Sequence, residues 1–343
     1  MKILVDAFGG DHSPIEIIKG TIDAVNERDG FTAVLVGKEE VIKEELKKYS
    51  FDSKRVEILP ASEVITCEEE PTVAIRRKPD SSLCVAFKEL KENEDVKALV
   101  SAGSTGAVLV GATLKLGRIK GVNRPALCPA LPTAEGDKRV FLMDCGANAD
   151  CKPINLVQFA LMGTAYAEAH GVVNPRVALL SNGAEDEKGN ALNHEVFPVL
   201  KKMGEEGKIN FVGNIEGRDI MNGNQDVVVT DGFSGNIALK SIEGAVGIVM
   251  KTIKKGIFST LSGKIGGLFL KKTFKDIKGK LDYHDKGGAL FIGVHKPVIK
   301  AHGSSKAFAI KNTVLQAVDY AEFNIADKIT EKLALQPEGV IGQ

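Results

Sequence analysis

Residues 227–236 read VVVTDGFSGN, and this stretch contains a pattern that recurs along the chain. The three valines predict a buried strand, and the glycine-rich turn after them leads into a helical pattern that continues through Ala245. Strand, glycine-rich turn and helix in repetition predict an α/β fold with a largely parallel sheet covered on both faces. Apolar runs of the same kind occur at residues 3–5, 33–37, 56–59, 98–100, 140–143, 177–180 and 209–213.

The composition excludes several classes of protein. The 343 residues contain 45 basic and 45 acidic side chains, no Trp and four Tyr, so neither charge nor stacking platforms favour a nucleic-acid partner. The five cysteines are odd in number and none form a C-x-x-C pair, which argues against a disulfide framework and a zinc site. No apolar stretch is long enough for a signal peptide or a membrane span. We therefore expect a soluble, cytoplasmic protein without a metal.

The loops after the predicted strands are the places where a ligand is expected. Ligands of open α/β sheets bind outside the carboxyl ends of the strands, and glycine lets backbone approach them closely. Free N–H groups at helix N-termini also favour an anion such as phosphate. The candidate substrate- and phosphate-binding residues are Asp6, Gly9, Gly10, Asp11, His12, Gly103, Ser104, Thr105, Gly106, Asp144, Asn148, Glu185, Asp231, Gly232 and His302.

Some of these residues have a purely structural alternative. Ser104 and Thr105 can bind phosphate or cap the helix that follows them. Cys145 follows a strand, but a buried, inert thiol is the simpler interpretation. His302 can act as an acid or base, or can lie in a packed turn. No G-x-G-x-x-G, P-loop or G-x-S-x-G motif is present, so neither a nucleotide cofactor nor a serine nucleophile is specified.

Taken together, the loop motifs resemble the phosphate acyltransferases of bacterial phospholipid synthesis. The matching stretches extend along nearly the whole chain: VDAFGGDHSP, AIRRKPDSS, SAGSTGA, GRIKGVNRPAL, DCGANAD, EDEKGN, VVVTDGFSGN and KPVIKAHGSS. The resemblance implies a three-layer, Rossmann-like fold of the isocitrate/isopropylmalate dehydrogenase type, shared with phosphotransacetylases. It also implies a homodimer. We expect no cofactor. The implied reaction transfers a fatty acyl group from an acyl carrier protein thioester to inorganic phosphate.

The resemblance further implies that Lys188 and Asn236 act in catalysis. Phosphate is itself a competent nucleophile, so the enzyme must hold an anion against a thioester and stabilise the tetrahedral oxyanion. Lys188 would orient the phosphate while Glu185 and Asp186 keep the lysine charged, and Asn236 would donate its amide to the oxyanion. A solvated surface turn is the alternative for residues 180–190.

The implied partner is small and acidic, so a basic patch should receive it. Residues 76–78 (RRK) and 118–120 (RIK) are the candidates, and an ordinary solvated run is the alternative for each. Two other functions stay open at this point: an NAD-dependent dehydrogenase on a related fold, and a non-catalytic scaffold that binds carrier protein at a membrane surface.

We expect one α/β domain over residues 1–343, with an amphipathic helical projection at residues 248–282. Between Lys251 and Lys280 there are nine lysines and one acid, and apolar residues recur at helical spacing. Such a segment favours reversible contact with the anionic inner face of the cell membrane, where a glycerol-3-phosphate acyltransferase would use the acyl phosphate. A dimer-interface helix is the alternative. The predicted membrane contacts are Ile257, Leu261, Leu268 and Phe269.

Overall fold

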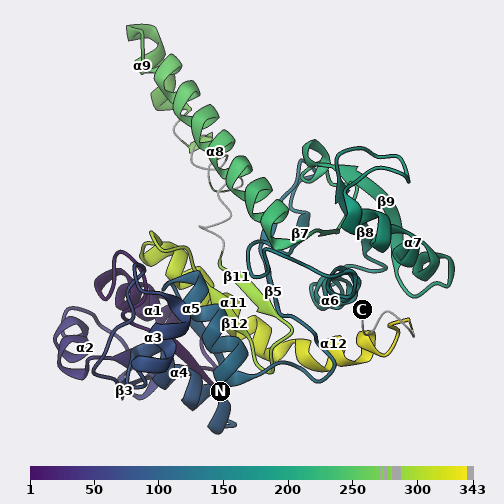
Figure 1. Cartoon of the computed structure of the whole chain (residues 1–343). Helices are drawn as coiled ribbons and strands as arrows, with labels where there is room; N and C mark the ends of the chain where they lie inside the picture. The colour runs from purple at the N-terminus through teal and green to yellow at the C-terminus, as the bar shows by residue number, and fades with distance from the viewer. Residues whose placement is uncertain (271, 274–276, 278, 280–286, 338–343) are drawn as a thin grey trace.

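The computed structural model describes residues 1–270, 272–273, 277, 279 and 287–337, which form two β-sheets flanked by helices (Figure 1). Among these residues the larger sheet has seven strands, in the order β3 (Val56–Pro60), β2 (Thr32–Gly37), β1 (Lys2–Asp6), β4 (Val96–Ser101), β12 (Val298–Lys300), β11 (Ala289–Ile292) and β5 (Ala126–Cys128). The smaller sheet has five, in the order β6 (Ala130–Pro132), β7 (Arg139–Met143), β10 (Val227–Val229), β8 (Arg176–Ser181) and β9 (Asn210–Glu216).

Both sheets are mainly parallel, as the sequence predicts. Strands β3, β2, β1, β4 and β12 run parallel to one another, as do β7, β10, β8 and β9. The antiparallel pairs are β12–β11, β11–β5 and β6–β7. Each strand predicted from an apolar run is confirmed, and the four that the sequence did not predict are β5, β6, β11 and β12. The carboxyl ends of the parallel strands thus provide the edges at which a site is expected.

Helices cover the sheets and connect the strands. The helices are α1 (Ile15–Glu27), α2 (Glu39–Leu46), α3 (Pro71–Arg77), α4 (Ser82–Glu92), α5 (Thr105–Gly111), α6 (Pro153–Ala169), α7 (Ala191–Glu205), α8 (Gly232–Ile257), α9 (Leu261–Phe269), α11 (Ala307–Glu322) and α12 (Ile325–Leu333). Short helical turns lie at η1 (Ser53–Arg55), η2 (Ala112–Leu116) and η3 (Gly217–Asp219).

The central strands bury both faces, because their side chains alternate between two apolar clusters. In β1, Ile3 belongs to a cluster with helices α1 and α11, whereas Leu4 faces the opposite cluster with α4 and α5. In β10, Val227 packs toward α6, and Val228 packs toward the first turns of α8. Each sheet is therefore the middle layer of three, which explains why its strands read as continuous apolar runs. The first cluster contains residues of both sheets. The division into a single domain stays a prediction.

Helix α8 leaves the body of the protein and carries α9 at its far end (Figure 1). The sequence predicts one helix through Ala245 and a helical projection from residue 248, whereas in the structure α8 runs without a break to Ile257 and α9 begins at Leu261. Phe269 at the tip is 84% exposed, whereas Ile257 is half-buried. The side chains of Leu261 and Leu268 lie outside the described residues, as does part of the predicted projection. No helix in the described part of the chain is both long and apolar enough to cross a membrane.

Candidate functional site

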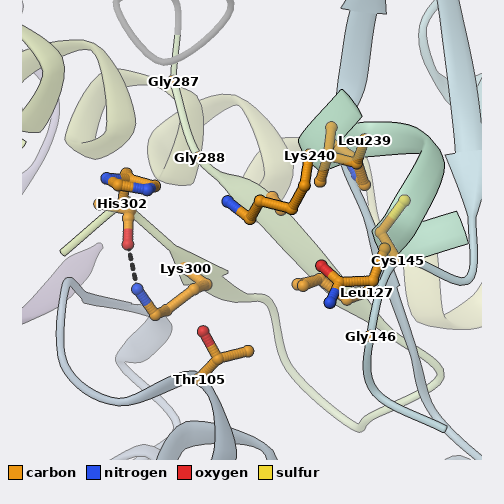
Figure 2. Close-up of a pocket in the computed structure, with 14 residues that line it drawn as sticks. Thr105, Leu127, Cys145, Gly146, Leu239, Lys240, Gly287, Gly288, Lys300 and His302 are labelled. Carbon is orange, nitrogen blue, oxygen red and sulfur yellow. Dashed lines mark hydrogen bonds between the residues drawn. The ribbon is translucent and has the colours of Figure 1, made fainter. Parts of the chain in front are cut away.

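A cavity of about 320 Å³ lies where loops from the two sheets meet (Figure 2). One wall comes from the end of β12 and the N-terminus of α5, and the opposite wall comes from the loop after β7 and the first turns of α8. No carboxylate occurs among the described residues of the lining. The lining consists of Thr105, Leu127, Pro129, Cys145, Gly146, Asn236, Leu239, Lys240, Gly287, Gly288, Ala289, Lys300, Ala301 and His302.

Asn236 is held in this wall by the start of helix α8. The Asp231 carboxylate caps the helix by accepting hydrogen bonds from the Ser234 amide at 2.8 Å and the Ser234 hydroxyl at 2.9 Å. A Cβ added to Gly235 would lie only 1.9 Å from the Asp144 carbonyl oxygen, so only glycine permits this approach of helix to loop. Asn236 therefore lies in the first turns of α8, which the Asp231 cap and the packing of Gly235 against Asp144 hold in place.

Asp144 and Asn148 hold the loop against which α8 packs. The buried Asp144 carboxylate accepts from the backbone amides of Leu127 at 2.9 Å, Ala147 at 3.1 Å and Asn148 at 2.7 Å. The Asn148 side chain also donates to this carboxylate and to the Pro125 carbonyl. Burial raises the pKa of Asp144, and these hydrogen bonds oppose that rise. Asp144 and Asn148, predicted to bind substrate, thus support the cavity wall and do not line it.

In the larger sheet, Asp6 has a comparable supporting position. Its buried carboxylate accepts from Ser82 Oγ at 2.6 Å and Ser101 Oγ at 2.7 Å, which joins the ends of β1 and β4 to helix α4. Burial raises the pKa of Asp6, and the two serine hydrogen bonds lower it. A Cβ on Gly9 would lie 2.7 Å from the Gly103 nitrogen, so these two loops meet through glycine.

The other candidates on this wall lie around the cavity rim. Thr105 lines the cavity, and Ser104 occupies the N-cap position of α5 without a side-chain cap hydrogen bond, so the capping alternative is not supported for its hydroxyl. The Asp11 amide donates to the Gly303 carbonyl at 2.8 Å, which brings the loop after β1 beside the turn after β12. The predicted residues that do not line the cavity are Gly9, Gly10, Asp11, His12, Gly103, Ser104 and Gly106 in the larger sheet's loops, and Gly232 at the start of α8, where a Cβ would lie 2.5 Å from the Asn148 carbonyl oxygen.

His302 and Cys145 also line the cavity. His302 Nδ1 lies 2.9 Å from the Ser304 hydroxyl, within an exposed turn. Cys145 is buried, and burial raises the pKa of its thiol well above the ordinary value, with a further contribution from Asp144. A thiol with a raised pKa is a poor nucleophile, which supports the interpretation of Cys145 as an inert side chain.

Two lysines of the cavity were not predicted. Lys240 lies one helix turn after Asn236, and its side chain extends across the cavity toward the wall that carries Lys300 and His302 (Figure 2). Lys240 could have been predicted from the sequence, because residues four apart share one face of a helix and Asn236 was already a candidate. Lys300 ends β12, a three-residue strand that the sequence did not reveal, and it is only 8% exposed. Lys240 forms an ion pair with Glu243 at 2.8 Å.

Lys188 is exposed and does not line the cavity in the described part of the chain. The Lys188 side chain and the Glu185 carboxylate both pack closely against Gly183. A Cβ added to Gly183 would lie 2.7 Å from Lys188 Cγ and 2.8 Å from Glu185 Oε2, so both side chains would have to move. Asp186 does not hold Lys188, contrary to expectation: its carboxylate pairs with Lys201 at 2.7 Å. The catalytic role of Lys188 stays a prediction.

Solved structures with a similar fold include two phosphotransacetylases. The enzyme from Streptococcus pyogenes has a TM-score of 0.61 at 17% identity, and the match covers 96% of this chain and 94% of that structure. The EutD phosphotransacetylase from Staphylococcus aureus has a TM-score of 0.58 at 17% identity, with 94% of each chain covered. A 4-hydroxythreonine-4-phosphate dehydrogenase from Klebsiella pneumoniae has a TM-score of 0.51 at 14% identity, covering 94% of this chain and 99% of that one. These likenesses confirm the predicted class of fold.

Sequence relatives extend the likeness to activity. A phosphate acyltransferase of Clostridium novyi (strain NT) is 49% identical over 330 residues, which are 96% of this chain and 97% of the relative. One from Clostridium tetani (strain Massachusetts / E88) is 46% identical over 335 residues, covering 97% of this chain and 98% of the relative. The profile of a family described as "Fatty acid synthesis protein" matches residues 1–328. The chain therefore belongs to this family and is an enzyme of the phosphate acyltransferase type, which transfers acyl groups to phosphate.

Proposed function

We propose that the enzyme transfers a fatty acyl group from an acyl carrier protein thioester to inorganic phosphate, which yields acyl phosphate for phospholipid synthesis. The observation that carries this proposal is the cavity itself: it contains two lysines and an asparagine amide, and no carboxylate among its described lining residues. Such a site favours an anion and offers a hydrogen-bond donor beside it. Membership of the phosphate acyltransferase family argues against an NAD-dependent dehydrogenase. A non-catalytic scaffold for carrier protein would not need a cavity with these side chains.

The proposed mechanism is direct attack of phosphate on the thioester carbon. A phosphate oxygen forms the new C–O bond, the carbonyl oxygen becomes an oxyanion, and the C–S bond then breaks. We assign oxyanion stabilisation to the Asn236 amide, because α8 holds this residue at the cavity wall. We assign Lys188 the role of offsetting phosphate charge. Strand β8, which precedes its loop, pairs in parallel with β10, so Lys188 and Asn236 follow neighbouring strand ends.

Helix α3 is the better of the two predicted docking surfaces for the acidic carrier protein. Arg76 and Arg77 in its last turn are exposed, and a Cβ on Gly106 would lie 2.6 Å from Pro71. Helix α3 therefore packs directly against α5, whose first residue, Thr105, lines the cavity. A carrier bound at α3 would be close enough to deliver its thioester on a flexible arm, and a basic surface would increase its rate of association.

Incubation of the purified protein with an acyl carrier thioester and phosphate, followed by mass spectrometry, tests the reaction. We expect acyl phosphate and free carrier in equal amounts, and no product when phosphate is omitted. Release of free fatty acid without acyl phosphate would mean that water, and not phosphate, is the acceptor. An acyl group found on the protein itself would replace direct attack with a two-step mechanism.

We also propose a cytoplasmic, homodimeric enzyme whose projection contacts anionic membrane reversibly and delivers acyl phosphate to a membrane-bound glycerol-3-phosphate acyltransferase. Exposed apolar side chains such as Ile248 (69% exposed) and Phe269 (84% exposed) accompany the exposed lysines Lys251, Lys254 and Lys255 on this segment. Apolar residues beside basic ones suit a surface-bound membrane segment, and each lysine near anionic lipid contributes about 1 kcal/mol.

Co-sedimentation with anionic liposomes tests the membrane proposal. We expect the wild type to pellet and the double variant Leu261→Glu/Phe269→Glu to stay in solution. Val173→Glu is a matched control, because Val173 is an exposed apolar residue (91%) that lies outside the projection. Equal pelleting of all three proteins, or dissociation of the double variant into monomers, would assign the segment to the dimer interface instead.

A further inference from the structure

Lys300 is a buried cation that forms no ion pair within the described part of the chain, although the Asp11 and Asp6 carboxylates act on it at longer range. It is 8% exposed, and its Nζ donates to the Ala102 carbonyl at 3.3 Å and to the Ala301 carbonyl. An ammonium group has three N–H donors, and the described residues supply acceptors for only two of them. Burying a charge is costly unless a counter-charge compensates it. Lys300 therefore lines a hollow with an unmet requirement for an acceptor, preferably an anionic one.

The opposite wall adds a second positive charge to the same space. Lys240 belongs to α8 of the smaller sheet, whereas Lys300 belongs to β12 of the larger sheet, and both line the cavity (Figure 2). The Lys240 ammonium is partly balanced by Glu243. An oxyanion between the two lysines would compensate Lys300 and would occupy the same cavity that the Asn236 amide lines.

We propose that Lys300, opposed by Lys240, binds the reacting phosphate and positions it for attack on the acyl carbon. This inference rests on the proposed function and adds a substrate-binding residue to it. In the reaction, hydrogen phosphate forms a C–O bond and the C–S bond breaks. The phosphate proton ends on the departing thiolate, so the carrier leaves as a thiol and the charges balance. Lys300 stays an ammonium throughout and transfers no proton.

The charged form of Lys300 is sensitive to pH. Burial lowers the pKa of Lys300 to about 8. Lys240 also lowers this pKa, whereas Cys67, Asp11 and Asp6 raise it. The lysine loses its charge as pH rises through that value, so kcat/KM for phosphate should fall above about pH 8. The pH dependence of kcat/KM is the right readout, because it reports pKa values of the free enzyme. An arginine at this position keeps its charge and should move the fall to higher pH.

Substitution of two lysines near the same hairpin tests the proposal. Lys300→Met removes the cavity cation. Lys296→Met is the matched control, because Lys296 Nζ also donates to two carbonyls, of Asn93 at 3.0 Å and Val96 at 3.1 Å, but does not line the cavity. We expect Lys300→Met to lower kcat/KM for phosphate by about 10- to 100-fold, the range for a hydrogen bond to a charged group, and to leave the KM for the acyl donor unchanged. Lys296→Met should match the wild type.

Thermal stabilisation by inorganic phosphate alone gives a readout that does not depend on turnover. Phosphate should raise the Tm of the wild type and of Lys296→Met, and it should not raise that of Lys300→Met. If the wild type makes acyl phosphate and Lys300→Met keeps both its phosphate KM and its Tm increase, the inference is wrong while the proposed function stands. If the wild type makes none, the proposed function fails, and the Tm increase still decides whether Lys300 binds phosphate. If Lys300→Met does not fold, Lys300→Arg decides the question. A fall of kcat/KM for phosphate at the same pH in Lys300→Arg and in the wild type would overturn the proposal.

Discussion

Two glycine-to-alanine substitutions in helix α8 should have opposite effects on stability. A Cβ at Gly235 would lie 1.9 Å from the Asp144 carbonyl oxygen, whereas a Cβ at Gly244 has no neighbouring atom within 4 Å. The displaced atom at Gly235 belongs to the backbone, so we take the upper end of the overpacking cost, about 3 kcal/mol. Alanine gains about 1 kcal/mol over glycine in a helix, which leaves a net loss of about 2 kcal/mol at Gly235 and a gain of about 1 kcal/mol at Gly244.

Urea unfolding of the two variants measures this difference directly. The midpoint should fall for Gly235→Ala and rise for Gly244→Ala. Activity provides a second readout, because Asn236 follows Gly235 and moves with it. A displacement of about 1 Å in a reacting group can cost about 100-fold in rate, so Gly235→Ala should lose activity by about that factor while Gly244→Ala keeps it. Midpoints that shift in the same direction, or full activity in Gly235→Ala, would refute the packing that we assign to this turn.

Three further substitutions test single residues of the site. Asn236→Ala should lower kcat by about 10²- to 10³-fold with little change in either KM, and an effect limited to the KM for phosphate would reassign the amide to ground-state binding. Lys188→Ala should abolish turnover and change the free energy of unfolding by less than about 0.5 kcal/mol, so near-normal activity in the purified variant would remove Lys188 from the mechanism. Asp231→Ala should lower the free energy of unfolding by about 1 kcal/mol through loss of the α8 cap, and an unchanged urea midpoint would contradict the capping role.

The sequence predicts the central parallel strands well because strands such as β1, β7 and β10 are buried on both faces and therefore consist of runs of apolar residues. Strands β5, β6, β11 and β12 were not predicted. Prolines interrupt the apolar residues of β5 and β6 in the segment RPALCPALP, so no continuous run stands out there as the three valines of β10 do. Strands β11 and β12 have four and three residues, and they pair with β5 and β4, which are distant in the sequence.

The same limit explains which site residues were found. Asn236 was predicted because it lies in a distinctive motif after an obvious strand. Lys300 was missed because β12, which carries it into the cavity, was not recognised. Asp6 and Asp144 were predicted to bind substrate because they are carboxylates at strand ends. In the structure, Asp6 accepts from two serine hydroxyls and Asp144 from backbone amides, so both support the site, which the sequence does not reveal. Their binding of substrate stays a prediction.

The length of helix α8 has a consequence for how an amphiphilic product would travel. The helix runs from Gly232 to Ile257, and the 17 residues beyond Lys240 (257 − 240) extend about 26 Å at a rise of about 1.5 Å per residue. One leaflet of a bilayer has acyl chains that span half of a hydrocarbon core about 30 Å thick, or about 15 Å. If the far end of the helix rests on lipid, a fatty chain whose head remains between the lysines is too short to reach the bilayer. The product would then have to leave the cavity entirely before its chain enters lipid, so its escape into water, or its capture by another protein, would precede any contact with the membrane.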